Sequence, residues 1–279
     1  MTDNSPSSSS SPPFSLHPTS QSLISSLTPF RFHSPFSQLE PYLPLPSSTL
    51  PFPLILTTAR LGDTPSKLAV LNDPRVTNEL TGPPFPYLEE HEVGWSQGKW
   101  RDTKEVFEGW ERTISAHQEK QKGEEGEREL VLEKPRMGLP FQCIRKEDGE
   151  WIGEIGVIRH GFLDVEDLEE RERLKKENDE REVGDEELVW CFGYYLATAY
   201  HGQGIMTSVL TSLIENYFIP YLDAHIIRAS AFSDNLASIR VQQKSGLVRT
   251  GKTYMVDINE KKGGGKREEC SLEWRRSTT

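Results

Sequence analysis

The chain has 279 residues, a formal net charge of −11 and 35% hydrophobic residues. Because acidic residues outnumber basic ones and no basic face is evident, the composition disfavours nucleic-acid binding. The sequence contains no run of about 18 apolar residues, so we expect no membrane-spanning helix. The three cysteines lack C-x-x-C spacing and the seven histidines are scattered, so we expect no metal site and a reducing compartment, the cytoplasm or alternatively the nucleus.

The first 50 residues contain 15 serines and 9 prolines but only three charged residues. Such a stretch offers few groups to a packed core, so we expect residues 1–50 to form a disordered tail that folding does not require. Its scattered phenylalanines leave open that parts of it lie against the fold. A single folded domain is expected over residues 51–276.

Two charged stretches interrupt this domain. Residues 164–187 carry 13 acidic and 5 basic residues, and a smaller mixed-charge stretch covers residues 118–134, after a helix expected at about 105–117. We interpret both as solvated insertions, the acidic one being helical or disordered. The alternative for residues 164–187 is an acidic lip that attracts a cationic ligand.

Apolar and alternating segments predict seven strands, at residues 52–61, 139–147, 150–160, 187–197, 225–231, 247–257 and 268–275. The strand at 187–197 is followed by a glycine pair, Gly202 and Gly204. These glycines let the backbone approach a ligand closely and point successive N–H groups in one direction. From Ile205 onward apolar residues recur with helical spacing. A glycine turn at a helix N-terminus predicts a binding site for a phosphorylated ligand.

A second strand and capped helix follow at residues 225–247. Ser233 or Asp234 suits the N-cap of that helix, and Gly246 occupies the place of a left-handed C′ residue.

These two segments resemble the GNAT superfamily of N-acetyltransferases. Residues 200–206 are similar to its pyrophosphate loop, Gln/Arg-x-x-Gly-x-Gly/Ala, although His201 and Met206 depart from the pattern. The second motif of the superfamily, Asn-x-x-Ser with a helix ending Lys-x-Gly-hydrophobic, is matched by Asn235, Ser238, Lys244, Gly246 and Leu247. Upstream, residues 54–61, 68–76 and 80–87 resemble the opening of the RimJ/RimL-type branch, which acetylates protein N-termini and small amines. The resemblance covers residues 52–276.

The resemblance implies a single α/β domain, with a mixed, twisted, mostly antiparallel sheet of six to seven strands and about four helices. The last two strands are expected to form a hairpin around residues 258–266. The implied activity is transfer of acetyl from acetyl-CoA to a primary amine, a protein N-terminus or a small molecule. Neither the acceptor nor the oligomeric state is set by the sequence.

The resemblance also implies roles for particular residues. Pantetheine is expected beside the backbone of Tyr195, Leu196 and Ala197. The pyrophosphate is expected against the backbone of His201, Gly202, Gln203, Gly204, Ile205 and Met206. Asn235 is expected to contact pantetheine, or alternatively only to cap its helix. Ser238 is expected to donate to the CoA sulfur, or alternatively to have no role beyond the helix.

The general base is the open question of the sequence. Some family members have a glutamate eleven residues before the pyrophosphate loop, where this chain has Trp190. Glu154 is the best remaining candidate, because it shares a strand face with Ile152 and Ile158. A carboxylate among apolar residues is unusual and suggests a functional role. The alternatives are that Glu154 is an exposed carboxylate, or that a water chain removes the proton.

Two functions of other classes remain open. The departures from the loop motif and the missing glutamate are also typical of a catalytically silent acyl-CoA-binding module that regulates or scaffolds partners. A module that binds another phosphorylated ligand is the third reading.

Overall fold

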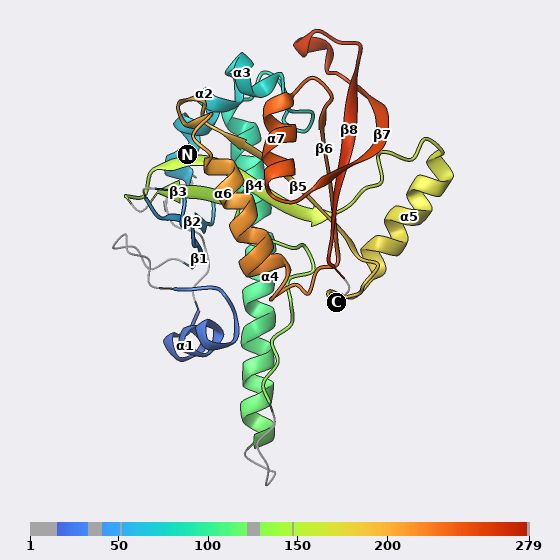
Figure 1. The fold of residues 1–279 in the computed structure, drawn as a ribbon. Coiled ribbons are helices and arrows are strands. Elements are labelled where there is room, and N and C mark those ends of the chain that lie inside the picture. The colour runs from blue at the N-terminus through green and yellow to red at the C-terminus, as the bar shows by residue number, and fades with distance from the viewer. Residues whose placement is uncertain (1–15, 33–40, 51, 122–128, 147, 278–279) are drawn as a thin grey trace, which may run out of the picture.

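The computed structural model describes residues 16–32, 41–50, 52–121, 129–146 and 148–277. These residues form one eight-stranded sheet in the order β1-β2-β3-β4-β5-β6-β8-β7 and seven α-helices (Figure 1). The strands are β1 (Tyr42–Leu45), β2 (Leu54–Thr57), β3 (Cys143–Lys146), β4 (Trp151–Arg159), β5 (Val189–Leu196), β6 (Ile226–Phe232), β7 (Val248–Asp257) and β8 (Lys266–Arg275). The helices are α1 (Pro18–Leu27), α2 (Thr64–Leu71), α3 (Pro74–Thr77), α4 (Glu89–Gln121), α5 (Leu168–Glu180), α6 (Ile205–Leu213) and α7 (Leu236–Lys244).

The expected mixed and mostly antiparallel sheet is confirmed. All neighbouring strands are antiparallel except β5 and β6, which are parallel. The predicted hairpin is present as β7 and β8, which pair from Asp257↔Lys266 onward. The sheet has one strand more than expected, because β1 adds an antiparallel edge strand to β2. The described residues also form three more helices than the four expected.

The sheet lies between two layers of helices (Figure 1). On one face, Lys99 of α4 contacts Glu154 of β4; on the other, Ser238 of α7 contacts Tyr194 of β5. Helix α6 packs firmly because its apolar residues fall on one face at i, i+1, i+4, i+5 and i+8. These are Ile205, Met206, Val209, Leu210 and Leu213, all of them buried.

Helix α4 is longer than the predicted 105–117, with 33 residues from Glu89 to Gln121. Its buried stripe of Phe107, Trp110 and Ile114 follows helical spacing. Its first turn contains Glu89, Glu90 and Glu92, whose negative charges stabilise the positive end of the helix dipole. The predicted insertion at 118–134 begins inside this helix, and residues 122–128 of it lie outside the described residues. In the described part of the chain, no helix combines the length and the apolar character needed to span a membrane.

The expectation of a disordered tail over residues 1–50 is wrong for the residues that the structure describes there. Helix α1 and strand β1 are formed, and Leu16, Ile24, Phe30, Phe32, Leu43 and Leu45 belong to the main hydrophobic core. Phe30 lies 5.4 Å from Trp110 and 5.1 Å from Phe141, measured between ring centroids. Leu43 and Leu45 alternate along the short strand β1, but the segment has no long periodic run that would predict its burial. Residues 1–15 and 33–40 lie outside the described residues.

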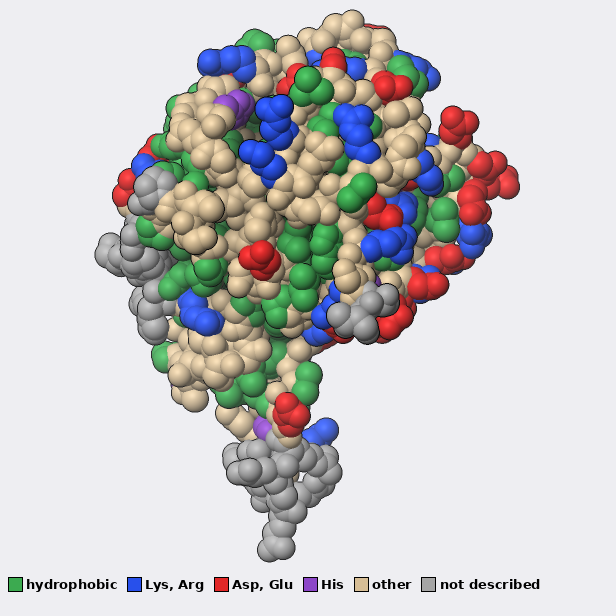
Figure 2. Space-filling view, viewed as in Figure 1, with side chains coloured by type: hydrophobic (Ala, Val, Ile, Leu, Met, Phe, Trp, Pro, Cys, Tyr) green, Lys and Arg blue, Asp and Glu red, His purple; other side chains and the backbone are tan. Residues whose placement is uncertain are grey.

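The acidic insertion at 164–187 contains helix α5. Its surface is charged, as the red side chains at the right of Figure 2 show, and Arg173 pairs with Glu170 and Glu177 along the helix. Asn178 is the buried exception. Its amide accepts from Val189 N–H and donates to Val189 C=O, both at 2.9 Å. The insertion is therefore helical and is fixed to the start of β5.

Candidate active site

The parallel neighbours β5 and β6 separate soon after they meet. They pair at Val189↔Ile226 and Trp190↔Ile227, and no further pair joins these two strands in the described sheet. Both strands continue beyond this point, β5 to Leu196 and β6 to Phe232. One edge of β5 therefore faces a split in the middle of the sheet.

The pairing of β5 with β4 decides which backbone groups face the split. Ala197 N–H donates to Ile152 C=O, and His160 N–H donates to Val189 C=O, both at 2.9 Å. Since hydrogen-bonded and non-bonded residues alternate in an antiparallel pair, the odd-numbered residues of β5 are directed at β4. The backbone groups of Phe192, Tyr194 and Leu196 are directed at the split.

This register bears on the pantetheine contact expected at Tyr195, Leu196 and Ala197, which stays a prediction. Of the three residues named, only Leu196 presents its N–H to the split, because the backbones of Tyr195 and Ala197 serve the pairing with β4. The sequence located the correct strand end, but it held no signal for which neighbour sets the register.

The glycine turn between β5 and α6 has the predicted geometry. Gly202 has φ 73° and Gly204 has φ 76°, both left-handed conformations that favour glycine. Nothing lies within 4 Å of the place where a Cβ would stand on either residue. Gly204 is the N-cap of α6, and no side chain of the described residues caps this helix. The first N–H groups of α6 are thus available to an anion.

The side chains around the turn fold back rather than outward. His201 Nε2 lies 3.0 Å from Leu196 C=O, and Gln203 Nε2 donates to Ala199 C=O at 2.7 Å. Ile205 and Met206 bury their side chains in the core. The predicted residues 201–206 therefore come together, and what they offer to a ligand is mainly backbone.

Helix α7 closes the split on its own side of the sheet. Asn235 Oδ1 accepts from Ser238 N–H at 3.0 Å, so Asn235 caps α7, and its contact with pantetheine stays a prediction. Ser238 Oγ lies 2.8 Å from the Tyr194 hydroxyl, which comes from β5. Gln242 Nε2 donates to Ser230 C=O of β6 at 3.1 Å, and its Oε1 is buried without a partner in the described chain. Tyr194 and Gln242 were missed, because alternation along a buried strand and helix is equally typical of packing.

Glu154 lies in a buried charge cluster. Its carboxylate is 2.6 Å from Lys99 Nζ and 2.9 Å from Lys67 Nζ. Only 6% of Glu154 is exposed, so the alternative of a solvent-facing carboxylate is wrong. Burial alone raises the pKa of Glu154, but the ammonium groups of Lys99 and Lys67 outweigh burial and hold that pKa below its usual range. Such a carboxylate has little affinity for a proton.

A second carboxylate completes the cluster. Glu92 accepts from Lys67 at 2.7 Å, from Ser96 at 2.6 Å and from the Tyr87 hydroxyl at 3.0 Å. Burial works against a charge on Lys67, but the neighbouring negative groups, Glu154 and Glu92 among them, raise its pKa. Two lysines and two glutamates therefore compensate one another and join α2, α4 and β4. Sequence reasoning found only Glu154, because its partners lie on distant helices.

Trp190, at the position of the family glutamate, is fully buried. The guanidinium of Arg159 lies 5.7 Å from its ring centroid. The structure thus places a packing residue where some family members have a carboxylate.

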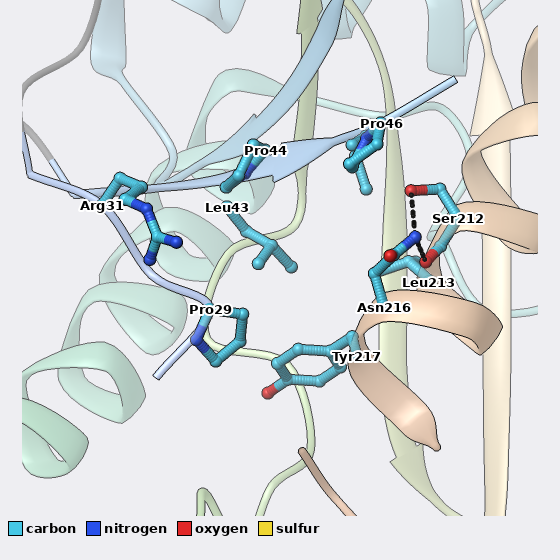
Figure 3. A pocket seen from close by; sticks show the side chains of 10 residues that line it. Pro29, Arg31, Leu43, Pro44, Pro46, Ser212, Leu213, Asn216 and Tyr217 are labelled. Carbon is cyan, nitrogen blue, oxygen red and sulfur yellow. Dashed lines mark hydrogen bonds between the residues drawn. The ribbon is translucent and has the colours of Figure 1, made fainter. Parts of the chain in front are cut away.

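A pocket of the described chain lies away from these residues. It measures about 240 Å³ and lies between the N-terminal segment and α6, with Arg31 and Pro44 on one side and Asn216 and Tyr217 on the other (Figure 3). None of the predicted site residues lines it. Within the described residues, no group of three or more His, Cys, Asp or Glu side chains has a geometry that could hold a metal ion.

Comparison with known proteins identifies the family. The family model described as the acetyltransferase (GNAT) domain matches residues 54–248, more than two-thirds of the chain. The protein belongs to this family of N-acetyltransferases, which confirms the family predicted from the sequence. No curated protein matches the chain.

Several solved structures are similar to the chain. RimL, a ribosomal L7/L12 alpha-N-protein acetyltransferase in complex with coenzyme A, is 16% identical with a TM-score of 0.47, over 83% of this chain and 97% of its own. Mycobacterium smegmatis RimJ in complex with CoA-disulfide is 16% identical with a TM-score of 0.48, over 84% and 86%. A ribosomal-protein-S5-alanine acetyltransferase from Vibrio fischeri is 14% identical with a TM-score of 0.48, over 84% and 96%.

Proposed function

We propose that the protein transfers acetyl from acetyl-CoA to a primary amine, either a protein N-terminus or a small molecule. The observation that carries this proposal is the split between β5 and β6, which ends at the glycine turn before α6. An extended amide-bearing chain suits the free edge of β5, and a phosphate suits the N-terminus of α6. Family membership supports the same donor.

The residues of the split have distinct tasks in this proposal. The N–H groups at the start of α6 hold the pyrophosphate, and the backbone of Phe192, Tyr194 and Leu196 pairs with pantetheine. An N–H directed into the split, that of Tyr194 or Leu196, stabilises the oxyanion that develops on the thioester carbonyl. The Ser238 hydroxyl supplies the proton for the departing sulfur, and the Tyr194 hydroxyl at 2.8 Å orients it.

The acceptor enters from the face opposite α7. On the α7 side, Tyr194, Ser238 and Gln242 fill the split. On the opposite side, Gly193 is exposed, and nothing lies within 4 Å of the place where its Cβ would stand. Lys262 and Arg267 of the β7–β8 region bind the carbonyl oxygens of Leu80, Pro83 and Asn78, so the loop 78–83 forms one wall of this side.

Glu154 receives a different task from the one first expected. Because two lysines neutralise it, we propose that it fixes α2 and α4 on β4 rather than serving as the base. Proton removal then falls to another group or to a water chain.

Acetyl-CoA binding and thiol release test the proposal. The purified protein is titrated with acetyl-CoA by calorimetry and then assayed for free thiol with peptides that have a free N-terminus, with polyamines and with amino acids. We expect binding, and turnover with at least one amine class. Binding without turnover over the whole panel would instead favour the silent acyl-CoA-binding module, to which Trp190 in place of the glutamate also points. Absence of binding contradicts both.

A further inference from the structure

One buried carboxylate, on the face of the sheet opposite α7, has no cationic partner among the described residues. Trp274 packs against Gly246 at the end of α7, 3.4 Å from the place of a Cβ there, so the even-numbered residues of β8 face α7. Glu269 has the opposite parity and faces the other side of the sheet. Only 8% of Glu269 is exposed.

The contacts of Glu269 are all with hydroxyl groups. Its Oε2 accepts from Ser230 Oγ of β6 at 2.5 Å and from the Tyr254 hydroxyl of β7 at 2.7 Å. Among the described residues, no lysine, arginine or histidine forms an ion pair with it. Its Oε1 has no hydrogen-bond partner in the described chain and is open to solvent. One oxygen of a largely buried carboxylate is thus free and accessible.

The other carboxylates of this face are neutralised. Glu273, four residues further along β8, pairs with Arg228 at 2.7 Å and Arg275 at 2.6 Å. Asp164 lies 3.5 Å from Lys252 and 3.8 Å from Arg228, and both of its oxygens are buried without a hydrogen-bond partner in the described chain, so its charge is paired but solvent does not reach it. Because a buried carboxylate without a counter-ion is costly, a cation that arrives from solvent would stabilise Glu269.

Glu269 also lies close to the split. Ser230, its hydrogen-bond partner, lies on the edge of β6 that faces the split, where Gln242 binds its carbonyl oxygen. On β5, burial raises the pKa of Cys191 to about 12, and the nearby Glu269 carboxylate adds to that rise. The exposed Gly193 follows Cys191 by two residues on the same strand face. The free oxygen therefore borders the side from which an acceptor reaches the thioester.

We propose that Glu269 binds the acceptor amine as its ammonium ion and takes its proton, directly or through one water molecule. This inference rests on the proposed function and adds the group that recognises the acceptor. It implies an acceptor that arrives with a positive charge, such as a free peptide N-terminus or an alkylamine. Ser230 and Tyr254 position the carboxylate through Oε2 and leave Oε1 for the amine.

The proton and electron balance is as follows. One ammonium proton passes to Oε1 of Glu269, and the freed lone pair forms the N–C bond to the acetyl carbon. The C–S bond breaks, and the sulfur takes a proton from the Ser238 hydroxyl. The second proton of the nitrogen leaves through solvent, from which Ser238 is reprotonated. Glu269 returns its proton to solvent, so both side chains are restored.

Glu269→Gln and its neighbour Glu268→Gln form a matched pair, because Glu268 is exposed on the same strand. We expect Glu269→Gln to lower kcat/KM for the amine by about 10²–10⁴-fold at pH 7, with unchanged acetyl-CoA affinity. Part of the loss should return at higher pH, where more of the amine is already neutral. Glu268→Gln should match the wild type, and Glu269→Asp should retain part of the activity.

Other charged and titratable groups lie near Glu269, and the test has to distinguish their effect on the pH dependence of activity from that of Glu269. Tyr254 and Cys191 face it from β7 and β5, Arg228 lies further along the face, and Arg267 is held by Glu79 and Asp234. Tyr254→Phe keeps the carboxylate, so it should lower activity less than Glu269→Gln and keep the wild-type pH profile.

A binding measurement separates this inference from the proposed function. A peptide with a free N-terminus is titrated into the protein saturated with CoA, with the N-acetylated peptide as the uncharged control. We expect Glu269→Gln to weaken binding of the free peptide at least about tenfold and to leave the control unchanged. If the wild type binds acetyl-CoA but turns over no amine, the proposed function fails and this titration decides the inference. Wild-type behaviour of Glu269→Gln in both assays, or no difference between the two peptides, overturns it.

Discussion

The buried cluster of Lys67, Glu92, Glu154 and Lys99 has two positive and two negative charges in contact. Removing one negative charge leaves Lys67, which is 0% exposed, with a single carboxylate. We expect Glu154→Gln to lower the free energy of unfolding by about 3 kcal/mol, because the remaining charge is no longer compensated. Urea unfolding measures this, with Glu172→Gln on the exposed surface of α5 as the control. Equal stability of both variants would show that the cluster contributes little.

His160 gives the fold a pH dependence of its own. Its Nδ1 accepts from Phe162 N–H at 3.0 Å, and burial, followed by the nearby Arg228, lowers its pKa to about 4. Since an unfolded histidine has a pKa of about 6.5, the unfolded chain binds more protons between these two values. Stability should therefore fall as the pH drops from 6.5 to 4, by about 2 kcal/mol from this group.

Urea unfolding at several pH values tests the His160 contribution. His160→Gln should flatten the dependence between pH 6.5 and 4, whereas His17→Gln, on the exposed surface, should keep the wild-type slope. An unchanged slope in His160→Gln would contradict the assignment.

Single residues also show where sequence reasoning stops. Strand alternation was enough to mark Glu154 as unusual, because an acidic residue shares a face with Ile152. Its meaning depends on Lys67 and Lys99, which come from α2 and α4, and no local pattern connects these helices with β4. The same holds for Glu269, whose partner Ser230 lies 39 residues away.

The glycine turn before α6 is the element most open to a direct test. Gly204→Glu places a side chain and a negative charge at the helix N-terminus, where phosphate is expected. We expect acetyl-CoA to bind about 30–100-fold more weakly, which corresponds to about 2–3 kcal/mol. Calorimetry measures the change.

The sheet offers a matched control for the backbone strain of that substitution. Gly251 has φ 79° and, like Gly204, has nothing within 4 Å of a Cβ position. Gly251→Glu therefore imposes similar strain and the same charge at a distant place, on β7. Equal acetyl-CoA affinities for the two variants would contradict the loop assignment.

Most helices and strands could be predicted from their own residues, but the contacts between them could not. The seven predicted strands are present within a few residues, because each has an apolar or alternating run of its own. Strand β1 was missed, since its four residues Tyr42–Leu45 include Pro44 and follow a serine-rich stretch. Proline is tolerated there because β1 is an edge strand with a neighbour on one side only.

At the scale of the whole molecule, the N-terminal segment is part of the folded domain. Phe30 is 0% exposed and contacts the rings of Trp110, Phe141, Tyr217 and Tyr221. We expect Phe30→Ala to cost about 3–5 kcal/mol, because it leaves a cavity among these rings. Leu27→Ala, 41% exposed in the same segment, should cost less than about 1 kcal/mol.

Thermal unfolding measures both variants, and a chain shortened to begin at residue 52 extends the test. That chain also loses β1 and the other buried residues of the segment, so it should fold poorly, contrary to the dispensable tail expected from composition. A melting temperature within a few degrees of the full chain would restore the original expectation. Composition misled here because it averages over residues, whereas burial depends on a few well-placed aromatic rings.

The two residue pairs that join β5 to β6 are the only backbone link between strands β1–β5 and strands β6–β8 in the described sheet. The sheet therefore consists of two hydrogen-bonded blocks, which share a hydrophobic core but are joined by few backbone hydrogen bonds. A ligand chain seated between them would act as a ninth strand and would join the two blocks into one cooperative unit. At 100 times its Kd, it would add about 2.7 kcal/mol to the unfolding free energy. Amide hydrogen exchange at Phe192, Tyr194 and Leu196 should report this, because these N–H groups change from free edge to ladder.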